Sequence, residues 1–504
     1  MPRTHARTST ACALGMALLL LPLLSLSAQQ PMEPDGAGFA AGIVRPAAPP
    51  LGWRSWNFFQ CNISQAVMQA QMDGIARPRK GGRSLLSLGY DHVGLDDCWQ
   101  NCDAPHGFFH DKVTGQPQID TTKFPSLGKM VEHGHALDVK VGFYQDNCRC
   151  HECERGHVGQ QCWNKNTHYP QDANLTQSLM FDGVKIDSCG NQRDMTEWAS
   201  EFAKPGNHPL LVESCGNGPK GTNPKKDQGI MPAWKAMLET TCPFSFYRVS
   251  VDLAPQWFSV VYNMNRALPY LGANPLSRPG CWAYSDMLEV GIRLPNGVGL
   301  THTESRVHFA MWTVTSSPLI LGFDLTDDAV VDSVMDIVAN EEVIAISQQW
   351  AGHPGRLVRN ASASFDALTK HGCSDRRGDN QSMPEYQVWA KPQPNRSIAL
   401  LVVNICDAEH CPDASKLSLD LTIPLSEIYV APWEEEDTAV IAAVPQAVRV
   451  RDIWGHSEQG VANGSVRVKG VGGHDGAFLL LTPTATASTA STADSTVVPT
   501  SVAS

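Results

Sequence analysis

The sequence predicts an α/β protein, a (β/α)8 TIM barrel followed by a C-terminal antiparallel β-sandwich domain. From Leu51 to Phe323, short apolar strands alternate with helical stretches, and such a repeat implies a parallel sheet. About eight strand–helix units fit this length, which favours a closed barrel. An open doubly wound sheet is the alternative, but no Gly-x-Gly-x-x-Gly motif follows a strand. After about residue 345, strand-like runs follow one another between Gly-, Pro- and Asn-containing turns, as in antiparallel sheets.

The predicted strands show a period of two. Within 183–187, for example, Gly183, Lys185 and Asp187 share one face, and Val184 and Ile186 share the other. Further barrel strands are expected at 90–96, 139–144, 210–213 and 319–323, with helices at 232–240 and 303–316. In the second domain, strands are expected at 386–390, 397–404, 417–423, 448–453 and 477–482.

The chain of 504 residues divides into four predicted parts. Residues 1–28 have the positive start, leucine-rich stretch and small residues of a cleaved signal peptide. A membrane anchor is the alternative, but the stretch is short for a span. The barrel is expected over 45–335 and the β domain over 340–484. Residues 485–504 are rich in Ser, Thr and Ala and have too few large apolar residues to pack, so they are predicted to form a disordered tail.

The composition indicates a secreted protein. Its net charge of −12 argues against nucleic acid and anionic membrane surfaces as partners. One of the 15 cysteines lies in the leader, and the even number left favours disulfides in an oxidising compartment. The expected location is either outside the cell or the lumen of an acidic endomembrane compartment, with no membrane attachment after cleavage of the signal peptide. The sequence leaves open whether the protein forms a homodimer. Six glycosylation sequons fit the same compartment: Asn62, Asn174, Asn360, Asn380, Asn395 and Asn463.

The first candidate catalytic group is a carboxylate at the end of a predicted strand. Lys185 and Asp187 are two residues apart, so both side chains point to the same side of the strand. In a barrel that side is the interior, and the C-terminal strand ends are where barrel enzymes carry catalytic groups. A neighbouring ammonium keeps a carboxylate ionised, as a nucleophile requires. On this spacing alone, a structural ion pair at the strand end is an equal alternative.

Two other patterns offer carboxylates. Asp96 and Asp97 can face one ligand only where their strand breaks into a loop, and there they would accept hydrogen bonds from neighbouring sugar hydroxyls. A calcium-binding or solvent-facing acidic pair is the alternative. Arg248 and Asp252 are four residues apart and share a face in a strand or a helical turn. Asp252 would be the second carboxylate that glycoside hydrolysis needs, although the spacing by itself favours a surface ion pair.

Aromatic residues and a cysteine cluster complete the candidates. Sugar faces pack well on aromatic rings, but a core role is the more common one for each ring near a predicted strand end: Trp53, Trp56, Trp99, Tyr144 and Trp282. Residues 148–162 hold a dense cluster of Cys and His. In a cytosolic protein it would indicate zinc, whereas in a secreted one it favours disulfides within a loop. No metal or organic cofactor is expected.

In this order, the motifs resemble glycoside hydrolase family 27, the melibiase-type α-galactosidases and α-N-acetylgalactosaminidases. The similarity begins at Leu51-Gly52-Trp53-Arg54-Ser55-Trp56-Asn57, which is similar to the family's opening Met-Gly-Trp-x-x-Trp motif. It continues through residues 89–99, 141–144, 184–189, 248–252, 279–282 and 286–288. It spans about residues 50 to 485, nearly the whole mature chain.

The resemblance implies a retaining hydrolase with Asp187 as nucleophile and Asp252 as general acid/base. Retaining geometry would place their carboxyl groups about 5–5.5 Å apart. The resemblance also implies disulfides Cys61–Cys98 and Cys215–Cys242, and a bond from Cys189 to a cysteine of the 148–153 cluster. The residues expected to contact the sugar are Asp96 and Asp97 at its 4- and 6-hydroxyls, Lys185 and Arg248 at ring hydroxyls, and Trp56, Tyr144 and Trp282 around the pocket.

The chain departs from the family pattern after Cys215. The family has Glu-Trp there in α-galactosidases and Ser-Trp in α-N-acetylgalactosaminidases, but this chain has Gly216-Asn217. That position reads the substituent at C2 of the sugar, so the choice between hydroxyl and N-acetyl stays open. Near Trp282, the sequence Ala283-Tyr284-Ser285 replaces the family's Asn-Asp-Pro and is expected to alter the support beneath the site.

The expected function is release of terminal α-linked galactose from oligosaccharides or glycoconjugates by double displacement. An α-N-acetylgalactosaminidase and a β-L-arabinopyranosidase are the enzymatic alternatives. Arabinopyranose lacks C6, so retention of both Asp96 and Asp97 argues mildly against the latter. A non-catalytic galactose-binding homologue would have lost a catalytic carboxylate, whereas both are present.

Overall fold

The computed structural model describes residues 40–101, 109–148, 166–216, 232–370, 379–411, 413–429 and 444–484. The expected signal peptide and C-terminal tail lie outside these ranges. Within them, eight parallel strands form one curled sheet in the order β7-β6-β5-β4-β3-β2-β1-β8. The backbone N–H of Leu288, beyond β7, donates to the carbonyl of Ile320 in β8 at 2.8 Å and so links the two outer strands. The predicted (β/α)8 architecture is confirmed.

The barrel strands are short, and nearly all of their residues are buried. Their register places Tyr144, Lys185 and Glu213 side by side on β3, β4 and β5, so polar side chains from three strands meet on the inner face. The strands are β1 (Leu51–Arg54), β2 (His92–Gly94), β3 (Lys140–Gln145), β4 (Gly183–Ile186), β5 (Leu211–Ser214), β6 (Phe246–Arg248), β7 (Trp282–Tyr284) and β8 (Leu319–Leu321).

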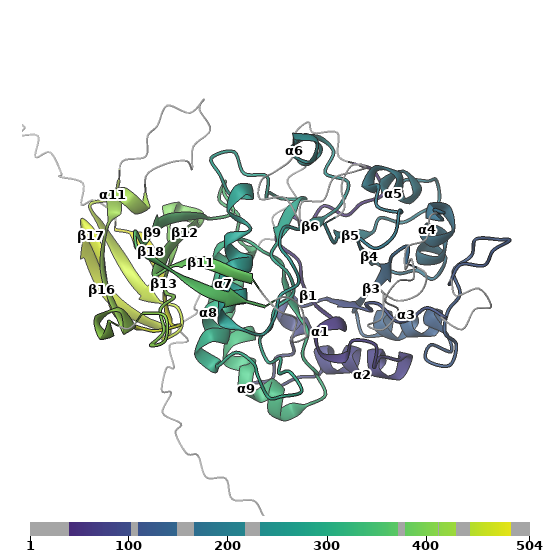
Figure 1. Ribbon diagram of the computed structural model, residues 1–504, viewed down its shortest axis with the longest axis horizontal. Helices are drawn as coiled ribbons and strands as arrows, with labels where there is room; N and C mark the ends of the chain where they lie inside the picture. The colour runs from purple at the N-terminus through teal and green to yellow at the C-terminus, as the bar shows by residue number, and fades with distance from the viewer. Residues whose placement is uncertain are drawn as a thin grey trace, which may run out of the picture. The chain divides into compact units, whose positions relative to one another are not determined.

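Helices follow the strands and cover the outside of the sheet, as Figure 1 shows for α3, α4 and α5 beside β3, β4 and β5. Several begin at a side-chain cap that satisfies free backbone N–H groups; Thr301 and Glu304 form a reciprocal capping box at α8. The helices are α1 (Trp56–Phe59), α2 (Gln65–Ala76), α3 (Leu127–Ala136), α4 (Tyr169–Ser178), α5 (Met195–Phe202), α6 (Pro232–Thr240), α7 (Trp257–Asn265), α8 (His302–Val314), α9 (Asp328–Val338) and α10 (Glu341–Gln348). None among the described residues is long and apolar enough to cross a membrane.

The C-terminal domain is a sandwich of antiparallel sheets. Its main sheet has the order β16-β15-β18-β13-β12-β9, and a second core of aliphatic side chains lies between it and the β14–β17 pair. The strands are β9 (Arg356–Asn360), β10 (Ser364–Thr369), β11 (Asp379–Pro384), β12 (Tyr386–Pro392), β13 (Ile398–Asn404), β14 (Ser418–Pro424), β15 (Ala447–Asp452), β16 (Ser457–Asn463), β17 (Ser465–Gly472) and β18 (Gly476–Pro483), with a short helix α11 (Leu425–Ile428). All five strands predicted in this domain are present.

The barrel and the β domain share a hydrophobic core. Trp257, the first residue of α7, donates its indole N–H to the carbonyl of Ile405 at 3.3 Å. Arg306 of α8 pairs with Asp475 at 2.9 Å, and Arg451 of β15 makes two 2.7 Å bonds to Glu342 of α10. The loop that carries Asp252 leads into α7, so the bond from Trp257 to Ile405 anchors the end of that loop.

Candidate active site

Asp187 directly follows β4, at the C-terminal end of the barrel, and is 7% exposed. Its carboxylate is held from three directions. The N–H of Ser188 donates to Oδ1 at 2.6 Å, the hydroxyl of Tyr144 donates to Oδ2 at 3.1 Å, and Nζ of Lys185 lies 3.8 Å from Oδ2. These donors stabilise a negative charge and fix its direction, which is the environment that an anionic nucleophile needs.

Asp96 lies beside Lys185. The chain leaves β2 after Gly94, and the N–H of Asp96 donates to Oγ of Ser55 at 3.0 Å. Its Oδ2 accepts a 2.8 Å bond from Nζ of Lys185. The adjacent Asp97 accepts from the N–H of Cys98, which has a positive φ of 78°. The strand therefore breaks into a loop at this acidic pair, as two adjacent carboxylates facing one ligand require.

Two buried residues that sequence reasoning missed extend this network. Arg54 of β1 lies 3.1 Å from Oε2 of Glu213 in β5, and 3.7 Å from Oδ2 of Asp96. Positive and negative groups thus alternate from Glu213 through Arg54, Asp96 and Lys185 to Asp187. Gly94 leaves space for the guanidinium, because a Cβ there would lie 3.0 Å from Cζ of Arg54. The sequence signal that could have revealed Arg54 and Glu213 is a single charged residue within an otherwise apolar strand, β1 in one case and β5 in the other.

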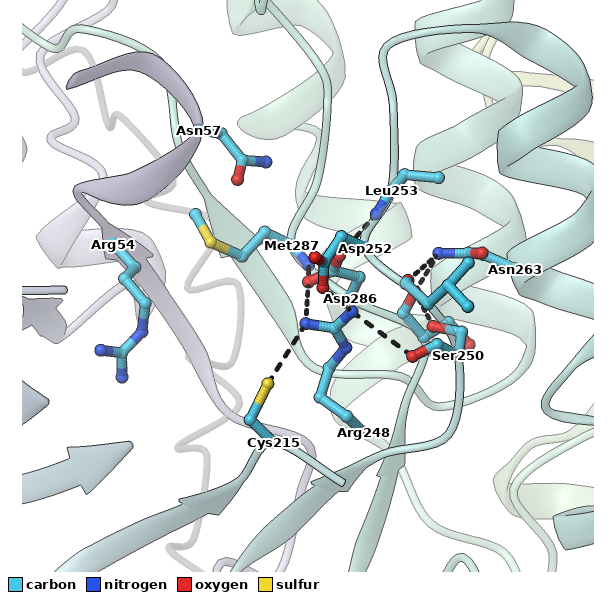
Figure 2. A network of polar contacts seen from close by, with 12 residues as sticks. Arg54, Asn57, Cys215, Arg248, Ser250, Asp252, Leu253, Asn263, Asp286 and Met287 are labelled. Atoms are coloured by element: carbon cyan, nitrogen blue, oxygen red, sulfur yellow. Dashed lines mark hydrogen bonds and ion pairs between the residues drawn. The ribbon is translucent and has the colours of Figure 1, made fainter. Parts of the chain in front are cut away.

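Arg248, at the end of β6, lies beside Cys215, Asp252 and Asp286 (Figure 2). Its Nη2 lies 3.1 Å from Oδ1 of Asp252, and its Nη1 lies 2.8 Å from Oδ1 of Asp286. The same Nη1 contacts the sulfur of Cys215 at 3.7 Å. The Asp252 side chain is 57% exposed whereas Arg248 is buried, so Asp252 presents its carboxylate to solvent.

Among the predicted aromatic contacts, Trp56 and Trp282 differ in position. Trp56 opens α1 directly after β1 and packs against the cluster containing Tyr284 and Met287. Trp282 instead begins β7, donates its indole N–H to the carbonyl of Pro46, and contacts the ring of Trp350. Pro46 precedes β1, so this indole fills the N-terminal end of the barrel. That placement does not fit the prediction that Trp282 contacts the sugar.

The disulfide predictions are confirmed in two cases and wrong in one. Cys61 pairs with Cys98, and Cys189 pairs with Cys148, a member of the predicted cluster. The predicted Cys215–Cys242 bond is wrong, because Cys242 pairs with Cys281. The reason is topological: Cys242 and Cys281 precede β6 and β7, whereas Cys215 follows β5 and lies at the opposite end of the barrel. The rest of the 148–162 cluster lies outside the described residues.

Gly190 holds the loop after Asp187 close to β3. Its φ is +81°, and a Cβ there would lie 2.0 Å from the carbonyl oxygen of Asn147. We expect Gly190→Ala to destabilise the fold by about 3 kcal/mol and to reduce kcat/KM more than tenfold, since the loop must move away. Thermal unfolding and initial rates measure the two effects. Gly206→Ala is the matched control, because its φ is +92° and nothing lies within 4 Å of the added Cβ. Equal losses in the two variants would contradict the crowding argument.

A parallel barrel whose C-terminal strand ends carry one buried carboxylate and one solvent-facing carboxylate has the arrangement that a barrel glycosidase needs. The family model described as alpha galactosidase A matches residues 48–349. The model described as the alpha galactosidase C-terminal beta sandwich domain matches residues 384–481. The chain therefore belongs to the melibiase-type α-galactosidase family, glycoside hydrolase family 27, and is a glycosidase.

Known members of the family resemble the chain over most of its length. The α-galactosidase of Cyamopsis tetragonoloba is 24% identical over 451 residues, which cover 86% of each chain. Among solved structures, an α-galactosidase from Saccharomyces cerevisiae matches with a TM-score of 0.64 and 19% identity, over 89% of this chain and 100% of that one. A family 27 β-L-arabinopyranosidase from Geobacillus stearothermophilus matches with a TM-score of 0.61 and 16% identity, over 87% and 97%. At these identities the structures establish the shared fold.

Proposed function

We propose that the protein is a retaining exo-α-galactosidase that releases terminal α-linked galactose from oligosaccharides or glycoconjugates. The observation that carries the assignment of roles is the contrast between the two carboxylates. Asp187 is buried and held by Lys185, Tyr144 and a backbone N–H, as suits a nucleophile. Asp252 is 57% exposed, as suits a group that must give a proton to the substrate and take one from water.

The reaction proceeds in two displacements. In the first, a carboxylate oxygen of Asp187 attacks the anomeric carbon while Asp252 gives its proton to the glycosidic oxygen, so the C–O bond breaks and the aglycone leaves as an alcohol. In the second, ionised Asp252 takes a proton from a water molecule whose oxygen attacks the anomeric carbon. Galactose leaves, Asp187 is again a carboxylate, and Asp252 is again protonated. The separation of about 5–5.5 Å between their carboxyl groups stays a prediction.

The sugar pocket would be formed by Asp96, Asp97, Lys185, Tyr144 and Trp56. Two hydrogen bonds orient Asp96: its carboxylate accepts one from Lys185, and its backbone N–H donates the other to Oγ of Ser55. This orientation supports the role of Asp96 as an acceptor for sugar hydroxyls. Acceptors positioned at the axial 4-hydroxyl would select galactose over glucose. Arg248 would add contacts on the side of Asp252.

Hydrolysis of p-nitrophenyl α-galactoside, compared with the α-N-acetylgalactosaminide and the β-L-arabinopyranoside, tests the proposal. We expect kcat/KM to be highest for the galactoside. A second candidate, α-N-acetylgalactosaminidase activity, is favoured by one observation: Gly216 follows Cys215 without a side chain at the position that reads C2. Preference for the acetamido sugar would establish the second candidate, and turnover of none of the three would reject both candidate activities.

Secretion with N-glycosylation is also proposed. The asparagines of all six sequons are exposed, and disulfides close the loops at Cys61–Cys98 and Cys242–Cys281. Both features suit an oxidising, glycosylating compartment. Protein expressed in a eukaryotic secretory host should appear in the medium, and enzymatic removal of N-glycans should increase its mobility on a denaturing gel. Intracellular retention without a mobility change would contradict the proposal.

A further inference from the structure

Asp286 occupies a buried and unusual position directly beside Arg248 (Figure 2). Its φ is +98°, a backbone conformation that residues with a side chain rarely adopt. Its contacts hold it there. Oδ1 accepts from Nη1 of Arg248 and from the N–H of Met287, both at 2.8 Å, and the carbonyl accepts a 2.7 Å bond from the indole of Trp312. A costly conformation that is secured from several sides indicates a functional role.

Asp286 reaches Asp252 by two separate routes. The first is Arg248, whose Nη1 binds Asp286 while its Nη2 binds Asp252 at 3.1 Å. The second is the backbone, since Oδ2 of Asp286 accepts a 2.7 Å bond from the N–H of Leu253, the residue after Asp252. Asp286 therefore restrains both the Arg248 guanidinium that touches Asp252 and the backbone directly after Asp252.

The charge of Asp286 matters as well as its position. A guanidinium beside Asp252 favours the ionised carboxylate, whereas a general acid must keep its proton until the leaving group takes it. The titratable and charged groups around Asp286 are Arg248, Asp252, Tyr284 and Glu289, and the Cys215 thiol contacts Arg248. Burial and the charge of Asp286 both raise the pKa of Glu289 well above its ordinary value, which favours the neutral form of Glu289. Asp286 is thus the buried carboxylate that can offset Arg248.

Burial, with a smaller contribution from the charge of Asp252, raises the pKa of Asp286 to about 6 against the opposing effect of Arg248. Two carboxylates that share one guanidinium lose their protons as a coupled pair rather than independently.

We propose that Asp286 is a positioning residue for the acid/base step: it fixes Asp252 through Arg248 and the Leu253 amide, and its charge offsets the guanidinium so that Asp252 stays protonated for the leaving group. The inference rests on the proposed function. It adds to that function a buried residue that governs the acid without touching the substrate.

The test compares wild type with Asp286→Asn, which keeps the shape and suits a positive φ while removing the charge. Two α-galactosides are used, one with an activated aryl leaving group and one with an alkyl leaving group. We expect kcat/KM to fall at least about 100-fold for the alkyl galactoside and less than about tenfold for the aryl one, because only the alkyl group needs a full proton. The basic limb of the kcat/KM profile should move to lower pH by about one unit, since ionisation of Asp252 becomes easier.

The controls separate positioning from folding. Asp286→Glu keeps the charge, so its basic limb should stay where wild type has it. Asp172→Asn removes a buried carboxylate that binds His110 and Gln192 on the outer side of the barrel, and should lower the rates of both substrates equally, if at all. Equal losses on the two substrates with an unmoved basic limb in Asp286→Asn would overturn the inference. If Asp286→Asn does not fold, Asp286→Glu is measured in its place, and equal losses of Asp286→Glu on the two substrates would overturn the inference.

Failure of the proposed function would look different. In that case wild type would hydrolyse neither α-galactoside. If wild type hydrolyses both and only the substrate-dependent loss is missing, the proposed function stands and the role of Asp286 is rejected.

Discussion

Replacement of Asp187 by Asn is expected to lower kcat/KM for α-galactosides by about 10⁴-fold or more, because the amide can neither attack the anomeric carbon nor carry the glycosyl intermediate. The fold should survive, since the amide oxygen can still accept from the N–H of Ser188, and the amide NH2 can donate to the hydroxyl oxygen of Tyr144. Initial rates on the aryl galactoside measure the loss, and thermal unfolding measures the stability.

The matched control lies at the other end of the same strand. Asp182 precedes β4 and accepts bonds from the N–H of Val141 and from His135, so Asp182→Asn removes a carboxylate without approaching the site. It should keep activity within about threefold of wild type, as expected for a partly exposed residue outside the site. A mechanism-based galactoside that forms a stable ester should label a peptide containing Asp187. Turnover within tenfold of wild type in Asp187→Asn, or a label elsewhere, would reject its assignment as nucleophile.

The largest effect on stability is expected from Arg54→Leu. This change leaves Glu213 buried at 2% exposure without its ion-pair partner at 3.1 Å, and removes a positive charge 3.7 Å from Asp96. Breaking a buried pair by removing one partner costs about 3–5 kcal/mol, because the other charge stays desolvated. Denaturant titration of purified protein measures this loss as a lower unfolding midpoint with an unchanged slope.

A double variant identifies the cause. Arg54→Leu combined with Glu213→Leu removes both charges, so most of the stability should return, to within about 1–2 kcal/mol of wild type. Its activity should stay low, because Asp96 loses part of the positive field that orients it beside Lys185. Arg451→Leu, which breaks a partly exposed pair with Glu342, should cost much less stability than Arg54→Leu. If Arg54→Leu costs no more than Arg451→Leu, the interior charges do not act as a network.

The sequence already indicated much of the fold and the site. The period of two placed Lys185 and Asp187 on one face of a strand, and the structure puts both at the C-terminal end of β4. The expected break after the strand that precedes Asp96 is also present. In contrast, the strands β9, β10, β11, β16 and β17 were not predicted. Of these, β16 is largely exposed and polar and carries no alternating apolar pattern. Periodicity detects a strand only where one face is buried.

The contributions of Arg54, Glu213 and Asp286 depended on the tertiary structure. Nothing near Arg54 in the chain indicates Glu213, since the pair forms only when β1 and β5 face each other across the barrel. Likewise, Asp286 reaches Leu253 only because β6 and β7 are neighbours. The wrong pairing of Cys215 has the same origin, because which cysteines meet depends on the end of the barrel at which each one lies.

By itself, therefore, the sequence determined the barrel followed by a β domain and the family, and it named Asp187 and Asp252 as the candidate carboxylates, because local alternation and the order of the motifs are properties of the chain itself. Only the tertiary structure decided which buried charges surround these carboxylates, which cysteines pair, and that Trp282 lies at the far end of the barrel. Ion pairs and disulfides depend on distances between residues that are remote in sequence, and only the closed sheet sets those distances.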